Sequence, residues 1–504
     1  MKWLEEQYKK NPNQLYMNEL TFGDVYEKVE NVARRLSNVL QQETRVALVS
    51  DNSTDMVIVL FSLLLLRKEV LLLNVRLTQK EMMEQIRGLD ISYVLTSDRR
   101  SKNILESLES DLEGNATVVA ATKKHHSAPT AHAMLQYPTM GTTHYRPRVD
   151  GATPWSYQVL SFSAISALPS NPSILFDWSM DPKQIAVIMN TSATTGKFKS
   201  VPIRWRQIEA HVKASMQRLG VCEDDNWLIV LPIFHVSGLS IVMRSLYNGT
   251  RITILPKYDR DEVVRLITNN TITMVSLVPT ILKELVPFIE RHRLRMILLG
   301  GEFIPQPLIR SCVQKRLPIF KTYGMTETFS QNVTFSVLEH LDKADSVGQP
   351  LPFMKVHIVN PDEEGIGEIH VSGPMLMDGY LGKEPIGESF NTDDIGYVDE
   401  DGYLYILNRR KDIIISGGEN IYPKEIEDVL YRLEDVVECA VVPVLNEVWG
   451  QVPALFIVTS LDEEQLRTYM EGRLAKYKVP TYIVKRNRLP RNASGKILRN
   501  QLHV

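Results

Sequence analysis

Short apolar runs alternate with amphipathic segments along most of the chain. The segments DEVVRLIT (261–268) and PTILKELVPFIERH (279–292) carry apolar residues at helical spacing, which predicts two helices. The apolar runs around them are too short for helices and predict β-strands at 45–50, 70–74, 227–232, 251–256, 271–278, 295–300 and 318–324. Alternating strands and helices are typical of layered α/β domains, so we expect an α/β fold.

The longest apolar run, MVIVLFSLLLL at 56–66, predicts a buried helix. It is about half the length needed to span a bilayer, and Arg67 and Lys68 follow it directly. The N-terminus, MKWLEEQYKKNPNQ, is charged and lacks the apolar segment of a secretion signal. We therefore expect neither export nor membrane insertion, and a cytoplasmic location.

Composition narrows the class of protein. A chain of 504 residues is long for a single core and predicts two or more domains. The formal net charge of −3 provides no overall attraction to nucleic acid. The cysteines, Cys222, Cys312 and Cys439, lie far apart in the sequence. This spacing argues against a disulfide framework and a zinc site, and it indicates a reducing compartment.

Two regions depart from the alternating pattern. Residues 97–180 are rich in Ser, Thr, His, Pro and Ala without sustained periodicity, which predicts long loops or a weakly ordered insertion. After residue 408, a β-like run with a glycine turn (409–420) precedes two helical segments (422–436 and 462–478). In the last of these, the apolar side chains that recur at helical spacing are Leu466, Met470, Leu474 and Tyr477. We expect a domain of residues 1–408 and a small one of residues 409–504.

The stretch TSATTGKFKS (191–200) has the composition of a phosphate-binding loop. It offers four hydroxyls followed by a glycine and a lysine: Thr191, Ser192, Thr194, Thr195, Gly196 and Lys197. The P-loop pattern of nucleoside triphosphatases fails, because its first glycine would be Thr191 and Lys197 is followed by phenylalanine. A Ser/Thr-rich surface turn is the plain alternative.

Three further segments carry candidate chemistry. YGMTET (323–328) holds the carboxylate of Glu327, a hard oxygen ligand of the kind that magnesium prefers. The segment NTDDIGYVDEDGYLYILNRRKD (391–412) holds Asp394 and Arg409, and LPRNASGKILRN (489–500) places Lys496 after a Ser-Gly turn. Taken singly, each is also consistent with a structural role, such as a helix cap or a solvated lysine.

Together, and in this order, these segments resemble the adenylate-forming enzymes, the family of acyl-CoA synthetases, beetle luciferases and the adenylation domains of peptide synthetases. The resemblance covers nearly the whole chain outside 97–180. It implies a large N-terminal AMP-binding domain of layered sheets and helices and a small, mobile C-terminal α+β domain. Further runs are similar to one kind of acid–CoA ligase within the family: LLLNVRLT, LPIFHVSGLS, ILLGGE, RRKDIIISGGENIYP, WGQVP, LAKYKVP and LPRNASGKILRNQL.

The resemblance implies an AMP-forming acid–thiol ligase. A small-molecule carboxylic acid attacks the α-phosphorus of ATP, pyrophosphate leaves, and the thiol of coenzyme A then attacks the acyl-adenylate. The implied cofactors are ATP, Mg²⁺ and coenzyme A as co-substrate. Because two anions must first meet, cationic and hydrogen-bonding groups should dominate the site.

The resemblance also implies a role for each matched residue. Those expected to hold the β- and γ-phosphates are Thr191, Ser192, Thr194, Thr195, Gly196 and Lys197. Those expected to border the adenine are Gly300, Gly301, Glu302, Tyr323 and Gly324. Glu327 would bind magnesium, and Thr326 would contact the α-phosphate. Asp394 would accept hydrogen bonds from the ribose hydroxyls, and Arg409 would support the ribose and phosphate. Lys496 would bridge the substrate carboxylate and the α-phosphate.

Two more residues have roles implied by the resemblance and a plain alternative. His235, in PIFHVSG, stands where the family places an aromatic residue or histidine beside the acyl group; the alternative is a satisfied core histidine. Lys411 stands at the family's hinge, about which the small domain would rotate between the half-reactions; the alternative is a solvated lysine.

The sequence departs from the family pattern at four positions. Ala193, Phe198 and Ser200 replace glycine, proline and often glycine in the phosphate loop, and Asp393 replaces the glycine before the ribose carboxylate. These changes put rate and affinity in doubt more than identity. Two alternatives stay open: a ligase for another fatty or aryl acid, and a catalytically silent nucleotide-binding protein. Oligomeric state also stays open, a homo-oligomer included.

Overall fold

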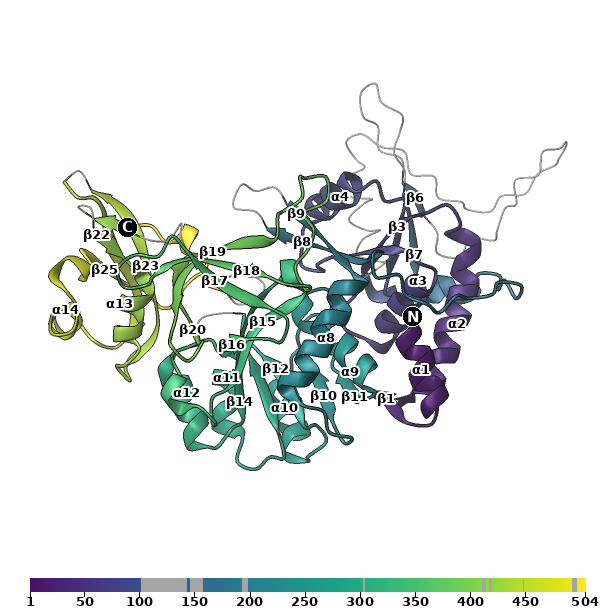
Figure 1. Ribbon diagram of the computed structural model, residues 1–504, viewed down its shortest axis with the longest axis horizontal. Helices are drawn as coiled ribbons and strands as arrows, with labels where there is room; N and C mark the ends of the chain where they lie inside the picture. Colours follow the sequence, from purple (N-terminus) through teal and green to yellow (C-terminus); the bar gives the residue numbers. More distant parts are fainter. Residues whose placement is uncertain are drawn as a thin grey trace, which may run out of the picture. The chain divides into compact units, whose positions relative to one another are not determined.

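The computed structural model describes residues 1–100, 143–145, 157–192, 198–301, 304–409, 414–416, 419–446, 448–491 and 496–504 (Figure 1). Two compact units emerge from its contacts. Unit 1 comprises Met1–Ile208, Ile229–Lys257 and Gly379–Glu384; unit 2 comprises Glu209–Leu228, Tyr258–Asp378 and Pro385–Val504. The domain boundary expected between residues 408 and 409 stays a prediction.

Unit 1 contains a seven-stranded sheet. In spatial order its strands are β6 (Thr143–Tyr145), β7 (Tyr157–Ser161), β5 (Tyr93–Thr96), β3 (Arg45–Val49), β4 (Glu69–Leu72), β8 (Ile185–Ser192) and β9 (Phe198–Arg204). The five inner strands pair in parallel, whereas β6 and β9 run antiparallel to their neighbours. The strands predicted at 45–50 and 70–74 are confirmed as β3 and β4.

Among the described residues, unit 1 contains the helices α1 (Lys2–Lys10), α2 (Phe22–Val39), α3 (Thr54–Leu65), α4 (Gln79–Gly88), α7 (Phe162–Ala167), α9 (Val236–Asn248) and the first turn of α8 (Trp205–Leu219). A ribbon of β2 (Leu20–Thr21), β1 (Leu15–Met17) and β11 (Arg251–Ile254) completes the unit. The apolar run at 56–66 forms α3 as predicted. Its start is capped by the Ser53 hydroxyl, which accepts the Met56 N–H, and every residue from Met56 to Leu65 is buried.

The prediction of loops throughout 97–180 was wrong for residues 143–145, which form β6, and for residues 157–167. β7 pairs in parallel with β5, and α7 follows at once, capped by the Ser161 hydroxyl. Tyr157, Val159 and Leu160 are buried, a short apolar pattern that the polar residues before it concealed. Residues 101–142 and 146–156 lie outside the described residues.

Unit 2 is built on a mostly parallel set of strands. In spatial order these are β16 (Gln349–Pro350), β15 (Ser330–Ser336), β14 (Ile319–Met325), β13 (Met296–Leu299), β12 (Met274–Leu277) and β10 (Asn226–Ile229). Its helices here are α10 (Arg260–Thr268), α11 (Pro279–Leu285), α12 (Gln306–Gln314) and the part of α8 (Trp205–Leu219) from Glu209 onward. The helix predicted over 279–292 ends at Leu285 and continues only as a 3₁₀ turn to Phe288. Pro287 has no N–H to extend the helix.

A four-stranded antiparallel sheet packs on β14 and β15. Its strands, in order, are β17 (Lys355–Val359), β18 (Gly367–Ser372), β19 (Ser389–Val398) and β20 (Leu404–Arg409). Val333 of β15, Ile369 and Leu404 form a buried cluster, against which Tyr323 and Ile406 are packed. This cluster fixes the position of β19 and β20 relative to the end of β14.

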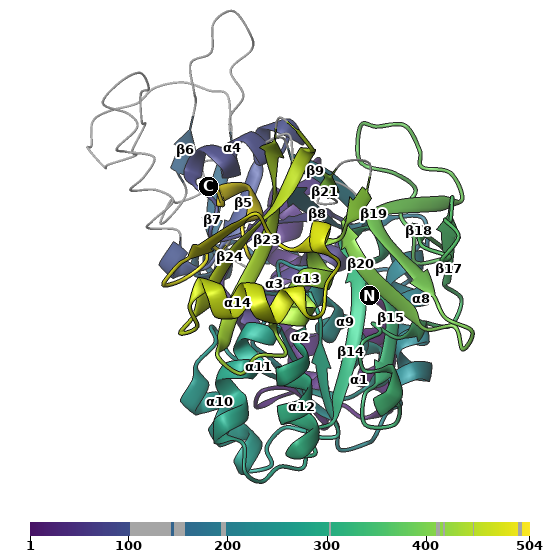
Figure 2. The same ribbon diagram turned by 90° about the vertical axis from the view of Figure 1, so that its left-hand side faces the viewer.

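The C-terminal part of unit 2 consists of strands and helices (Figure 2) that have a buried core of their own. Its strands are β22 (Glu419–Ile421), β21 (Ile414–Ser416), β24 (Gly450–Thr459), β23 (Val436–Asn446) and β25 (Tyr482–Lys485), with the helices α13 (Pro423–Leu430) and α14 (Glu463–Glu471). The predicted amphipathic helix is shorter than expected, because the chain leaves it at Gly472, a weak helix former. Leu474 still packs on the core, whereas Tyr477 is 42% exposed. Among the described residues, no helix is long and apolar enough to cross a bilayer.

Candidate functional site

The ends of β13 and β14 form one wall of the candidate site. The strands are parallel, with Leu299 opposite Lys321, so Gly300 and Gly301 lie beside the end of β14. A Cβ atom on Gly300 would lie 2.6 Å from the carbonyl oxygen of Thr322, so only glycine fits. Gly301 has a φ of +86°, which favours glycine. The two glycines therefore leave this wall without side chains. Glu302, predicted with them, lies outside the described residues.

A tight turn after β14 carries Thr326 and Glu327. It is a 3₁₀ helix, η2 (Thr326–Thr328), between the antiparallel strands β14 and β15. A Cβ atom on Gly324 would lie 1.6 Å from the carbonyl oxygen of Ser330, so the turn requires glycine there. Phe329 and Ser330 follow with φ angles of +53° and +104°. Non-glycine residues pay about 1 kcal/mol or more for such a conformation, so this turn is strained.

Asp394 and Tyr323 meet although they are far apart in the sequence. The Tyr323 hydroxyl donates a hydrogen bond of 2.6 Å to Oδ2 of Asp394. Asp394 is buried, and its N–H donates to the Thr392 hydroxyl at 3.2 Å. In the antiparallel ladder of β19 and β20, Asp394 lies opposite Arg409, of which the structure describes the backbone. Tyr323, on β14, and Asp394 and Arg409, on β19 and β20, thus come together where the two sheets pack on each other.

These elements enclose a cavity of about 250 Å³. The predicted site residues in its lining are Gly301, Tyr323, Gly324, Asp394 and Lys496. Thr326 and Glu327 are not in the lining but sit on the turn just beyond β14. The structure therefore gathers these five predicted residues around one space.

Four charged residues of this lining were not predicted from the sequence: Lys321, Asp345, Lys424 and Asp428. Lys321 is 4% exposed, and its Nζ donates to the carbonyl oxygen of Ala344 at 2.7 Å. Burial, and then the charge of Lys424, lowers the pKa of Lys321 to about 7. Burial likewise raises the pKa of Asp428 to about 6. The available signal was the alternation in IFKTYG, which puts Lys321 on the same face as the buried Ile319.

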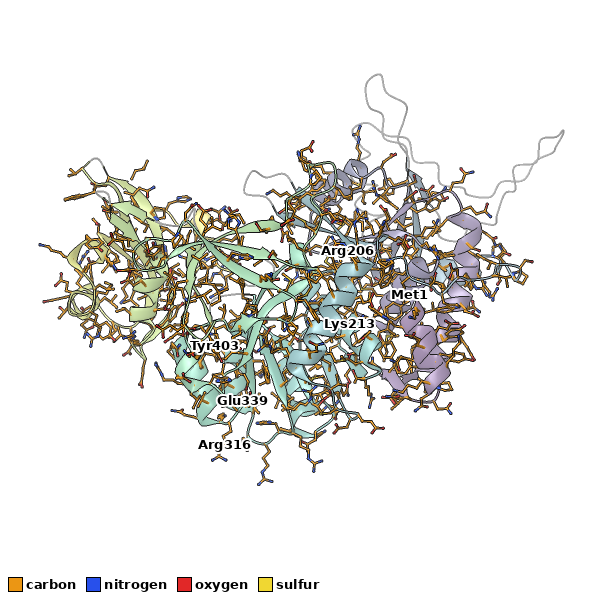
Figure 3. All side chains as sticks on the ribbon, viewed as in Figure 1. Met1, Arg206, Lys213, Arg316, Glu339 and Tyr403 are labelled. Carbon is orange, nitrogen blue, oxygen red and sulfur yellow. The ribbon has the colours of Figure 1, made fainter. Side chains whose placement is uncertain are left out.

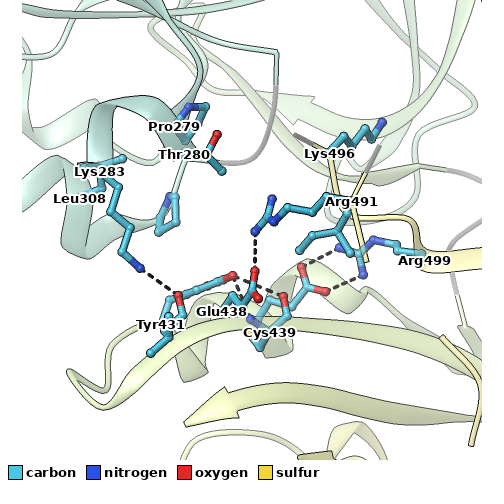
Figure 4. A pocket seen from close by; sticks show the side chains of 14 residues that line it. Pro279, Thr280, Lys283, Leu308, Tyr431, Glu438, Cys439, Arg491, Lys496 and Arg499 are labelled. Atoms are coloured by element: carbon cyan, nitrogen blue, oxygen red, sulfur yellow. Dashed lines mark hydrogen bonds and ion pairs between the residues drawn. The ribbon is translucent and has the colours of Figure 1, made fainter. Parts of the chain in front are cut away.

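Lys496 also borders a second cavity, of about 330 Å³ (Figure 4). Around it, Arg499 makes a two-pronged ion pair with Glu427, with distances of 2.6 and 2.9 Å. Arg491 pairs with Glu438 at 2.5 Å. These pairs tie the segment after β25 to α13 and β23, and so they fix the backbone that carries Lys496, itself exposed. The residues 492–495 before it lie outside the described residues.

His235 caps the start of α9 in unit 1. Its N–H donates to the carbonyl oxygen of Pro232 at 3.1 Å, and a Cβ atom on Gly238 would lie 2.3 Å from that same oxygen. The glycine of PIFHVSG is therefore needed for the close approach of the helix to this loop. Burial, and then the charge of Arg76, lowers the pKa of His235 to about 4, so its imidazole is neutral near pH 7.

The phosphate loop connects β8 and β9. The last residue of β8 whose side chain is described is Thr191. Its hydroxyl donates to the carbonyl oxygen of Lys199 at 3.4 Å. Ser192 is described only by its backbone, which pairs with Phe198. Four predicted residues of this loop lie outside the described residues: Thr194, Thr195, Gly196 and Lys197. The same holds for Ala193 and for Lys411, the expected hinge residue.

The structure gives a reason for one departure in this loop. The ring of Phe198, which stands where the family has proline, lies against α4, since a Cβ atom on Gly88 would be 3.0 Å from it. The aromatic side chain therefore packs on a helix of unit 1. Ser200 is buried, and its carbonyl oxygen accepts the Leu381 N–H at 2.9 Å.

A second departure, Asp393, occupies a position suited to glycine. Its φ is +61°, and its N–H donates to Oδ1 of Asn391 at 2.8 Å. We expect Asp393→Gly to stabilise the protein by about 0.5 kcal/mol, because about 1 kcal/mol of left-handed strain is relieved and glycine's extra chain entropy offsets about half of it. Thermal unfolding measures the change. The control is Asp362→Gly, in a surface turn; an equal rise in both midpoints would contradict the strain argument.

Comparison with known proteins agrees with this arrangement. The chain matches the model of the AMP-binding enzyme family over residues 4–381 and that of the AMP-binding enzyme C-terminal domain over residues 425–496. It is 47% identical over 503 residues to a 2-succinylbenzoate–CoA ligase of Lactococcus lactis subsp. lactis (strain IL1403), with 100% of both chains covered.

Solved structures agree as well. Two structures of o-succinylbenzoate CoA synthetase from Bacillus subtilis are similar to this chain with a TM-score of 0.83 and 31% identity. One is in complex with the acyl-adenylate intermediate OSB-AMP. Its alignment covers 99% of this chain and 97% of that chain. The other, in complex with ATP and a magnesium ion, is covered over 99% by 99% of this chain. The adenylate-forming fold predicted from the sequence is thereby confirmed.

Proposed function

This chain belongs to the AMP-binding enzyme family, and on that premise we propose that it is an ATP-dependent, AMP-forming acid–CoA ligase whose acid is 2-succinylbenzoate. The observation that carries the proposal is the similarity to a 2-succinylbenzoate–CoA ligase over the full length of both chains, at 47% identity. The reaction makes an acyl-adenylate and then the CoA thioester, a step of menaquinone biosynthesis.

The cavity of about 250 Å³ is the proposed nucleotide site. Gly300 and Gly301 let an adenine ring approach the backbone, and Tyr323 borders it. Asp394 accepts hydrogen bonds from the ribose, a role that suits a buried carboxylate already held by the Tyr323 hydroxyl at 2.6 Å. Arg409 supports the ribose and phosphate from the neighbouring strand.

The turn after β14 is the proposed magnesium site. Glu327 offers a carboxylate, the hard oxygen donor that magnesium takes together with phosphate oxygens. When bound, the ion would neutralise phosphate charge. The phosphate loop, from Thr191 to Lys197, would hold the β- and γ-phosphates. Thr326 would contact the α-phosphate.

Lys496 and His235 act at the acid. Lys496 would place its ammonium between the substrate carboxylate and the α-phosphate and offset the negative charge that builds up during attack. His235 borders the acyl group as a neutral imidazole, since its pKa is lowered to about 4 by burial and then by Arg76. A neutral ring packs against the acid without adding charge. Rotation of the small domain about Lys411 before thioester formation stays a prediction.

The deciding experiment is a pyrophosphate-release screen across carboxylic acids, with and without coenzyme A. We expect 2-succinylbenzoate to give the highest kcat/KM for pyrophosphate release and a CoA thioester when CoA is added. A fatty or other aryl acid that gives a higher value would replace the proposed substrate. No release with any acid, while ATP still binds, would favour a silent nucleotide-binding protein. Retention of Glu327, Asp394, Arg409 and Lys496 argues against that alternative.

The proposed substrates are small molecules: the acid, ATP and CoA. No nucleic acid partner is proposed, in line with the net charge of −3. A cytoplasmic location and the oligomeric state stay predictions from the sequence.

A further inference from the structure

A buried polar cluster connects α8 to the strained turn that carries Glu327. His211 and Ser215 lie one turn apart on α8, and both are buried, whereas Arg206 and Lys213 on the same helix are partly exposed (Figure 3). Neither His211 nor Ser215 contributes to the nucleotide cavity or to any role proposed above. Burying polar side chains costs free energy unless they are hydrogen-bonded, so the cluster calls for an explanation.

The contacts of His211 lead to the turn. Its Nε2 accepts the backbone N–H of Gln331 at 3.4 Å, which requires that nitrogen to carry no proton. Its ring meets the ring of Phe329 edge-on, with 5.3 Å between the centroids. Phe329 and Ser330 are the two residues with positive φ, and Gln331 follows them directly. His211 therefore contacts the turn on both sides of Ser330.

The rest of the cluster extends to the nucleotide cavity. The Ser215 hydroxyl donates to Oε1 of Gln331 at 3.1 Å, and Nε2 of Gln331 donates to the Thr334 hydroxyl at 2.9 Å. The Thr334 hydroxyl lies 3.0 Å from that of Thr322, a lining residue of the cavity. Hydrogen bonds between buried side chains hold each of them in one orientation. The cluster connects α8 with the strand that forms the cavity wall.

Strain explains why the turn needs support. Two adjacent non-glycine residues in the left-handed region persist only where their surroundings determine the conformation. Opposite His211, the carbonyl oxygen of Glu327 accepts the Met377 N–H at 2.9 Å. The turn is thus held at its start by this bond and at its end by His211.

We infer that His211 is a positioning residue that holds the turn Thr326–Ser330 in the conformation in which the Glu327 carboxylate meets the magnesium of ATP. The inference rests on the proposed function, in which Glu327 binds that ion. His211 itself touches neither metal nor nucleotide. Its effect passes through the N–H of Gln331 and the ring of Phe329.

The test is ATP binding by calorimetry at varied Mg²⁺, without any acid. His211→Phe keeps the ring and removes the acceptor; it should raise the Mg²⁺ concentration for half-maximal ATP binding about tenfold, since a buried N–H loses its partner. His211→Gln restores an acceptor and should recover most of the loss. Ser215→Ala, on the same helix, is the control: it removes a hydroxyl that reaches only the Gln331 side chain, so the Mg²⁺ requirement should not change.

If His211 has a structural role alone, all three variants should be less stable to heat, and each should need the same Mg²⁺ concentration as the unchanged protein. That result would overturn the inference. So would an equal weakening of ATP binding with Mg²⁺ and with EDTA. If His211→Phe does not fold, His211→Met takes its place with the same expected shift. Absence of ATP binding in the unchanged protein would overturn the proposed function together with the inference. ATP binding without turnover of 2-succinylbenzoate would overturn the choice of acid alone.

Discussion

Lys496→Ala is expected to abolish adenylate formation while sparing most of thioester formation from pre-made acyl-adenylate. In the first step a carboxylate meets the α-phosphate, and the Lys496 ammonium offsets both charges. Removing one such group costs about 100- to 1,000-fold in kcat. In the second step the carboxylate is already joined to phosphorus as a mixed anhydride, so less charge needs to be offset. Pyrophosphate release measures the first step, and CoA thioester formation from synthetic acyl-adenylate measures the second.

The control for this variant is Lys485→Ala. Lys485 lies on β25 in the same part of unit 2, is exposed, and its Nζ donates to the carbonyl oxygen of Leu461 at 2.7 Å. The change removes an equal charge away from both cavities, and neither half-reaction should slow. Equal loss of both half-reactions in Lys496→Ala would indicate misfolding or a different role for this lysine.

The sequence predicted the elements of the site better than their ends. Apolar run length was enough to place β13 and most of β14, because short apolar runs that end in glycine are typical of strands. Helix ends were missed where one residue stops the helix: Pro287 after α11 and Gly472 after α14. The proline and the glycine were both visible in the sequence. The helix was nevertheless extended past each of them, because apolar residues at helical spacing continue beyond it.

The buried charges could not be assigned from the sequence. Lys321 and Asp428 read as ordinary charged residues, and only packing of distant elements buries them. Burial is a property of the tertiary structure, whereas spacing reports only which residues share a face. His211 was missed for the same reason: its partners lie on β15, and no local pattern joins α8 to that strand.

The family resemblance supplied what spacing could not. Asp394 and Tyr323 are 71 residues apart, and they meet only because β18 to β20 pack on β14 and β15. The motifs named both residues for the nucleotide, but their hydrogen bond to each other was not predicted. That bond leads to the second prediction of large effect.

Asp394→Ala is expected to raise the KM for ATP about 10- to 100-fold with little change in kcat. The carboxylate accepts the ribose hydroxyls in the ground state and the transition state alike, so its loss weakens uniform binding. Hydrogen bonds to a charged group contribute about 1.5 to 3 kcal/mol each. Unlike the loss in Lys496→Ala, this one extends to the second half-reaction, because the acyl-adenylate keeps its ribose. The measurement is KM for ATP and for acyl-adenylate in the two separate assays.

The hydrogen bond from Tyr323 raises the question whether the Asp394 carboxylate depends on the Tyr323 hydroxyl to bind ATP. If the Tyr323 hydroxyl orients Asp394, then Tyr323→Phe should raise the KM for ATP about fivefold, the cost of about 1 kcal/mol for one hydrogen bond. In the Asp394→Ala background the same change should have almost no further effect, because the group that it orients is gone. Asp394→Asn keeps the shape and removes the charge, and it should fall between the unchanged protein and the alanine variant. Fully additive losses in the double variant would mean that hydroxyl and carboxylate act independently, and the 2.6 Å bond would then be structural.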